Sequence, residues 1–202
     1  GSSVGTASLG GMDAMHAQGG LPIPDIVHIN QPYWYGEGQD YSSEEFGLLR
    51  ANELEEIINK VGEHNIAAFI AEPIQGAGGV IIPPETYWPQ IKSICEKYEI
   101  LLVVDEVICA FGRTGRWFGS HTYDLNPDII TIAKGLSSGY QPIGGSAISK
   151  NISDKIDHKK DHDGLEPSSV VNVNSGGFGT VITLHKCSYG HCYCKNQKKN
   201  SH

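Results

Sequence analysis

Two segments of the chain carry apolar residues at helical spacing. The first begins at Ser42, a residue type favoured at helix N-caps, continues with acids in its first turn, and ends at Gly62. The second follows Pro83-Pro84-Glu85, and its apolar stripe comprises Trp88, Ile91, Ile94, Cys95 and Tyr98. This period of apolar and polar positions predicts two amphipathic helices.

Short continuous apolar runs alternate with these helices. They lie at residues 67–71, 100–104, 128–133 and 144–149. A short run without polar alternation is typical of a strand that is buried on both faces. Strands that alternate with helices need crossover connections, so the sequence predicts an α/β fold with a mainly parallel sheet and flanking helices.

Both ends of the chain lack such patterns. Residues 1–40 are rich in Gly and Pro, and we expect an irregular segment with aromatic anchors at Tyr33, Trp34 and Tyr35. After Lys150 the chain becomes rich in Lys, His, Asp, Asn and Ser. In that part, residues 170–173 and 181–184 are the only candidates for short strands.

Composition excludes several classes of protein. The 202 residues carry a formal net charge of −8, which argues against a general nucleic-acid binder. No apolar run is long enough for a transmembrane helix, and Gly1 to Gly11 lack the features of a signal peptide. We therefore expect a soluble protein without nucleic-acid or membrane partners, and the sequence leaves open whether it is cytoplasmic or mitochondrial.

Charged residues follow three of the predicted strands. Glu72, Asp105 and Lys134 each stand where an apolar run ends. In open sheets with parallel strands the ligand site lies at the carboxyl ends of the strands. The sequence therefore predicts that these three side chains belong to one site.

Three common nucleotide and hydrolase sites do not fit. The run that ends at Asp105-Glu106 is similar to a strand that holds Mg²⁺ in ATPases, but the chain contains no GxxxxGK[ST] phosphate loop. Residues 76–79 do not match GxGxxG, and no GxSxG motif is present. With these sites excluded, the remaining candidate is a site built from a lysine and a carboxylate at neighbouring strand ends.

A lysine that leaves an apolar strand beside glycine suits Schiff-base chemistry, because burial favours its neutral amine. A buried carboxylate can pair with a protonated pyridine nitrogen. Together, Lys134 and Asp105 offer the two groups that pyridoxal 5'-phosphate (PLP) needs from a protein.

Four sequence motifs resemble those of the class III aminotransferases. They are residues 105–107 (DEV), 111–115 (FGRTG) and 132–140 (IAKGLSSGY), with 72–76 (EPIQG) on the preceding strand. Several motifs in the right order make the resemblance specific, and residues 77–79 and 87–89 are most similar to the omega-amino acid:pyruvate and taurine:pyruvate branch. The resemblance implies part of the large domain of a fold-type I PLP enzyme.

That resemblance also implies roles for single residues. Lys134 would form the Schiff base with the cofactor and move the proton, and Asp105 would pair with the pyridinium nitrogen. Val107 would pack on one face of the ring, and Glu72 and Gln75 would lie near the cofactor. The reaction would transfer an amino group from an amine or omega-amino acid to a keto acid such as pyruvate, in a homodimer.

Two positions depart from the ornithine- and γ-aminobutyrate-type relatives. Those relatives carry Glu where this chain has Ala77, and Gln where it has Ile108. Both differences fit the pyruvate-dependent branch, so we expect neither ornithine nor γ-aminobutyrate as the substrate.

The resemblance covers residues 1–152, and enzymes of the family are much longer than this chain. We expect 1–152 to be a partial PLP-binding domain and 153–202 to be a disordered segment or the product of a frameshift. Two alternatives stay open for the function: a catalytically inactive fragment, or a related PLP-dependent aminomutase or decarboxylase.

Residue types that could bind a metal ion gather near the end of the chain. His185, Cys187, His191, Cys192 and Cys194 are residue types that bind Zn²⁺. Their spacing is CxxxxC followed by CxC, which differs from the paired CxxC of common zinc sites. We therefore expect no metal site here.

Overall fold

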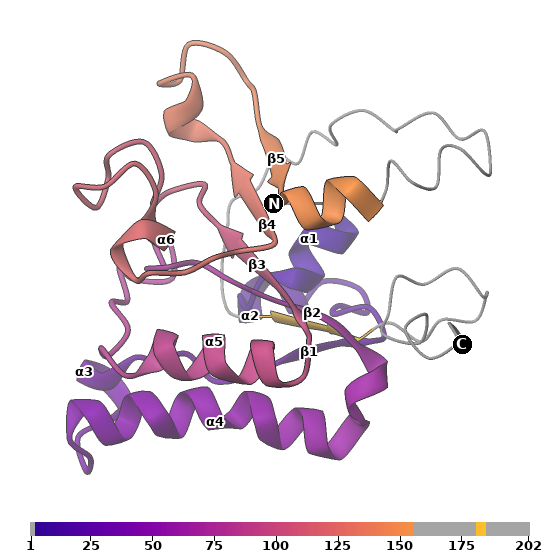
Figure 1. Cartoon of the computed structure of the whole chain (residues 1–202), viewed down its shortest axis with the longest axis vertical. Helices are drawn as coiled ribbons and strands as arrows, with labels where there is room; N and C mark the ends of the chain where they lie inside the picture. The colour runs from indigo at the N-terminus through magenta and orange to yellow at the C-terminus, as the bar shows by residue number, and fades with distance from the viewer. Residues whose placement is uncertain (1–2, 156–180, 185–202) are drawn as a thin grey trace.

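The computed structural model describes residues 3–155 and the backbone of residues 181–184. Helices and strands follow one another along most of the described chain, and one mixed sheet lies at its centre (Figure 1). The helices are α1 (Val4–Leu9), α2 (Asp13–His16), α3 (Trp34–Glu37), α4 (Ser43–Val61), α5 (Tyr87–Lys97) and α6 (Gly119–Thr122), with 3-10 turns η1 (Glu63–Asn65) and η2 (Lys134–Leu136). Residues 150–155 are helical as well.

The sheet has the strand order β1-β6-β2-β3-β4-β5. Its strands are β1 (Ile26–His28), β2 (Ile66–Ala71), β3 (Leu101–Asp105), β4 (Ile129–Ile132), β5 (Gly145–Ile148) and β6 (Val181–Leu184). β2, β3 and β4 are parallel neighbours, whereas β5, β6 and β1 pair antiparallel. The predicted α/β class is confirmed, and the parallel part of the sheet is its centre.

The two long helices form where the sequence predicts them. In α4 the Ser42 hydroxyl accepts from the Glu45 amide, the Glu45 carboxylate accepts from the Ser42 amide, and Gly62 ends the helix at a φ of 87°. α5 starts at Tyr87, after the residues of the predicted opening. Figure 1 shows α4 and α5 side by side along one face of the sheet.

The main core lies between these helices and the sheet. Side chains that are at least nine-tenths buried come from α4 (Leu54, Ile58), from α5 (Trp88, Ile91, Ile94) and from the strands (Phe69, Leu102, Val104). Burial of this apolar surface is the main source of stability. It also fixes which ends of β2 and β3 face the same edge.

The expectation of an irregular segment over residues 1–40 is wrong in part. The segment contains three short helices and the edge strand β1. A capping box between Ser3 and Thr6 starts α1, and β1 pairs with β6. Elements of three to six residues are too short to show a helical or strand period, so their pairing and capping partners decide them.

Strand β6 confirms one of the two weak candidates after Lys150. It pairs antiparallel with β2 on one side and with β1 on the other. The other candidate, at 170–173, lies outside the described residues, as does most of 153–202.

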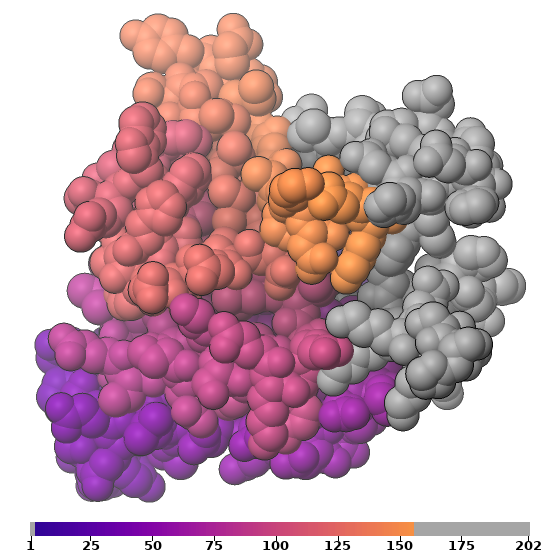
Figure 2. Space-filling view, viewed as in Figure 1, coloured from indigo at the N-terminus to yellow at the C-terminus, as the bar shows by residue number. Residues whose placement is uncertain are grey.

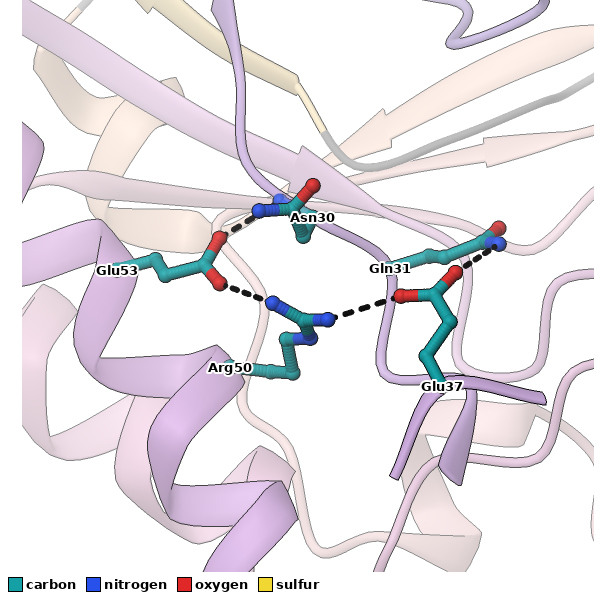
Figure 3. A network of polar contacts seen from close by, with 5 residues as sticks. All are labelled: Asn30, Gln31, Glu37, Arg50 and Glu53. Carbon is teal, nitrogen blue, oxygen red and sulfur yellow. Dashed lines mark hydrogen bonds and ion pairs between the residues drawn. The ribbon is translucent and has the colours of Figure 1, made fainter. Parts of the chain in front are cut away.

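An ion-pair network attaches the segment before α4 to that helix (Figure 3). The Arg50 guanidinium lies 2.9 Å from the Glu37 carboxylate and 2.7 Å from that of Glu53. The other oxygen of Glu53 accepts from the Asn30 amide, and that of Glu37 from the Gln31 side chain. Arg50 is mostly buried and also lies 4.7 Å from the centre of the Phe46 ring, so the whole segment is fixed on α4.

The connection between β4 and β5 stands out from the rest of the described chain. Figure 2 shows it as a projection at the top of the view, beyond the body formed by the helices. Tyr140 and Ile143 are exposed there. Lys134 stands at the start of this connection.

Among residues 3–155, no helix is long and apolar enough to span a membrane.

Gly47 marks the closest approach between α4 and the segment before α5. A Cβ atom on Gly47 would lie 2.3 Å from Oγ1 of Thr86 and 2.8 Å from Cβ of Pro84. We expect Gly47→Ala to lower the free energy of unfolding by about 1–3 kcal/mol, because a well-packed contact must open. Urea unfolding followed by circular dichroism measures this change.

Gly5 in α1 provides the matched control. A Cβ atom there meets nothing within 4 Å, so Gly5→Ala gains the helix propensity of alanine, up to about 1 kcal/mol. Equal effects of the two substitutions would contradict the packing argument.

Candidate functional site

The three charged residues that follow the strands lie at one edge of the sheet. Because β2, β3 and β4 are parallel neighbours, their carboxyl ends point the same way: Ala71 pairs with Val104, and Asp105 with Thr131. The charges of Asp105 and Lys134 both act on the pKa of Glu72, and that of Lys134 acts on the pKa of Asp105. The predicted constellation of Glu72, Asp105 and Lys134 is therefore brought together.

Asp105 is held by hydrogen bonds to one of its two oxygens. Oδ1 accepts from the backbone amide of Val107 at 3.0 Å and from the Thr131 hydroxyl at 3.0 Å. Oδ2 receives no hydrogen bond from residues 3–155. Burial raises the pKa of Asp105, and both hydrogen bonds and Lys134 oppose that rise.

Glu72 is the more buried of the two carboxyls, with 5% of its surface exposed. Oε2 accepts from the backbone amide of Gly76 at 2.9 Å, whereas Oε1 is buried without a hydrogen-bond partner. Burial raises the pKa of Glu72 to about 7; Asp105 adds to the rise, and Gly76 and Lys134 oppose it. Glu72 is therefore the group in this site that changes charge near neutral pH.

Gln75 lies in the same loop, which is held at both ends. The backbone of Gln75 exchanges hydrogen bonds with that of Ile81, at 3.1 and 2.9 Å. The indole N–H of Trp88 donates to the Pro73 carbonyl at 3.0 Å, which ties the loop to α5. The Gln75 side chain is buried in this loop, with 3% of the residue exposed, and its proximity to a cofactor stays a prediction.

Val107 lies two residues beyond Asp105, and its side chain is buried. Its backbone amide positions the Asp105 carboxylate. The contact of its side chain with a cofactor ring stays a prediction.

Lys134 differs from the expectation in one respect. It stands at the start of η2 with a φ of 44°, and its side chain is exposed. The sequence suggested apolar surroundings, because Lys134 follows the apolar run that ends at Ala133. The left-handed backbone turns the chain outward at this point, so Lys134 leaves the core for the accessible edge of the sheet.

Two further residues that shape the site were not singled out from the sequence. Thr131 is the one polar residue of β4, and its hydroxyl binds Asp105. Glu106 is fully buried, and its carboxylate accepts from the amides of Gly119 at 2.8 Å and Ser120 at 2.6 Å. A hydroxyl inside an apolar strand is a signal that sequence analysis could use; the partners of Glu106 come from a loop and are visible only in the fold.

Within residues 3–155, no group of three or more His, Cys, Asp or Glu side chains could hold a metal ion. The Cys and His cluster at 185–194 lies outside the described residues.

The sequence profile of the family described as aminotransferase class-III matches residues 1–164. The chain belongs to the class-III aminotransferase family. This confirms the resemblance seen in the motifs. The match extends beyond residue 152, and the division of the chain at that residue stays a prediction.

Named relatives support the same family. The chain is similar to a putrescine–pyruvate aminotransferase of Pseudomonas aeruginosa, with 63% identity over 152 residues, 75% of this chain and 33% of the relative. It is 48% identical over 157 residues to a chloroplastic gamma aminobutyrate transaminase of Solanum lycopersicum, covering 77% of this chain and 30% of the relative. The expectation against γ-aminobutyrate therefore gains no support from the relatives.

A solved structure supports the same family. The omega transaminase from Pseudomonas jessenii in complex with PMP matches with a TM-score of 0.79 and 44% identity, over 82% of this chain and 37% of that one. The chain thus spans about a third of the length of the relatives it matches.

Thr131 allows a direct test of how Asp105 is held. We expect Thr131→Val to raise the pKa of Asp105 further, because a hydrogen bond to the charged form is lost. ¹³C NMR of the labelled carboxyl groups measures the change. Thr131→Ser keeps the hydroxyl and serves as the control; an Asp105 titration that is the same in all three proteins would contradict the role of Thr131.

Glu106 is expected to be a strong determinant of stability. Glu106→Gln replaces one acceptor by an N–H group that faces backbone donors, so the free energy of unfolding should fall by about 2–3 kcal/mol. Urea unfolding measures it, with the exposed Glu96 of α5 as the site of a matched Glu→Gln control. A loss no larger than that of Glu96→Gln would show that the two backbone contacts contribute little.

Proposed function

We propose that this chain carries part of the PLP-binding large domain of a transaminase that moves an amino group from an amine or omega-amino acid to a keto acid such as pyruvate. One observation carries the proposal: Asp105 and Lys134 lie at the ends of neighbouring parallel strands and are electrostatically coupled. The family membership supports it, and so do relatives with names such as putrescine–pyruvate aminotransferase.

The described residues fit PLP. Asp105 keeps Oδ2 free of hydrogen bonds from residues 3–155, as an acceptor for a pyridinium N–H needs, while its Oδ1 is fixed by Thr131 and Val107. The exposed Lys134 amine lies at the accessible edge, where it can reach an aldehyde. The buried Oε1 atom of Glu72 adds a polar group without a hydrogen-bond partner in the described chain.

When bound, PLP supplies an aldehyde for covalent attachment and a ring that accepts electrons. Asp105 would hold the proton of the ring nitrogen in place through its charge. Lys134 would provide the covalent anchor and then move a proton at Nζ. Its left-handed backbone fixes the direction in which the side chain leaves β4. As the resemblance implies, we propose that the intact enzyme is a homodimer.

Covalent labelling tests the proposal. The protein is incubated with PLP, reduced with borohydride and digested, and mass spectrometry locates the pyridoxyl group. We expect the label on Lys134, and we expect Lys134→Ala to abolish it and to lower alanine formation from pyruvate and putrescine by at least about 100-fold.

Lys150 gives the control. It is an exposed lysine that pairs with Asp154 at 2.9 Å. It follows β5, whose end pairs with the start of β4 at the opposite edge of the sheet from Lys134, so Lys150→Ala should leave the label unchanged. Absence of label, or label that survives Lys134→Ala, would reject the role of Lys134. Label without transfer to pyruvate would favour the alternative of a catalytically inactive fragment.

A further inference from the structure

Glu72 has few hydrogen-bond donors for a buried carboxylate. Of its two oxygens, Oε2 accepts one backbone amide and Oε1, although buried, receives no donor. An ionised carboxylate in such a place leaves a charged oxygen without solvent or hydrogen bond, which is costly. A proton on Oε1 removes that charge.

The apolar side chain of Ile108 packs against the loop that holds Glu72. The amide of Gly76 binds Oε2, and a Cβ atom on Gly76 would lie 2.3 Å from Cδ1 of Ile108, so these residues are in close contact. Ala77 follows directly. Ala77 and Ile108 are the two positions at which the sequence departs from the ornithine- and γ-aminobutyrate-type pattern. Both are apolar here, and neither supplies Glu72 with a side-chain donor.

The hydrogen-bond donors around the two carboxyls favour a proton on Glu72 and not on Asp105. Glu72 faces Asp105 from β3, Lys134 from the start of η2 and the thiol of Cys109 from the loop after β3. Asp105 has two hydrogen-bond donors on Oδ1, whereas Glu72 has one donor in all. Because donors stabilise the charged form, the negative charge belongs on Asp105.

We propose that Glu72 is a positioning residue that holds the single proton of a Glu72–Asp105 carboxyl pair, so that the pair carries one negative charge and Asp105 carries it. This inference rests on the proposed function, because the charge of Asp105 matters for a pyridinium partner. Protonated Glu72 keeps a second negative charge out of the site. As the pH rises through about 7, Glu72 ionises and this arrangement is lost.

A ¹³C NMR titration of the labelled aspartate and glutamate carboxyls tests the proposal without the cofactor. The resonance that disappears in Glu72→Gln identifies Glu72. We expect its midpoint near pH 7, and a titration step of the Asp105 resonance at the same pH that is missing in Glu72→Gln. A Glu72 midpoint below pH 5 would overturn the inference.

Stability gives an independent measurement. A carboxyl whose pKa is raised on folding stabilises the folded state fully below its unfolded value of 4.5, and this contribution is lost as the pH rises to about 7. The urea midpoint of the wild type should therefore fall between pH 4.5 and pH 8, and that of Glu72→Gln, which cannot ionise, should fall less. Glu96→Gln should behave like the wild type; equal falls in all three proteins would overturn the inference.

The labelling of Lys134 separates this inference from the proposed function. If Glu72 titrates near pH 7 and Lys134 takes no label, the proposed function fails and the protonation of Glu72 stands. If Lys134 is labelled and Glu72 titrates below pH 5, the proposed function stands and the role of Glu72 fails.

Discussion

The parallel pairing of β2, β3 and β4 is the constraint on which the site depends. Each of these strands is followed or ended by a charged residue, and parallel strands present equivalent ends to the same edge. An antiparallel neighbour in place of β3 would send Asp105 to the opposite edge. α4 and α5 are needed for this arrangement, because they cover one face of the sheet and form the apolar core with it.

Several features of the fold could be predicted from the sequence because they are local and strongly periodic. The two long helices and the central strands have capping residues or continuous apolar runs, and their observed bounds differ from the expected ones by a few residues. β1, α1 and α2 could not be predicted, since three to six residues show no period and their partners are distant in the chain. The antiparallel direction of β5 depends on how the chain returns after Lys134, which strand composition does not encode.

The site shows the same division. Glu72, Asp105 and Lys134 could be found because each interrupts or follows an apolar run. The contacts that set their properties could not, because they join residues far apart: Thr131 with Asp105, Trp88 with the carbonyl of Pro73, and Glu106 with the amides of Gly119 and Ser120. Lys134 is exposed and has a φ of 44°, and neither property can be read from a pattern of apolar residues.

That backbone angle is sustained by the elements on both sides of it. A non-glycine residue in the left-handed region costs about 1–3 kcal/mol and persists only where its surroundings fix the chain. β4 enters the connection after pairing with both β3 and β5, and Ile132 pairs with Gly145 at the far end of the hairpin. At its base, Asp128 accepts the amides of Leu102 and Ser149, so both strands are anchored to β3. Lys134 thus stands two residues beyond the end of β4, exposed enough to meet a ligand and fixed enough to meet it beside Asp105.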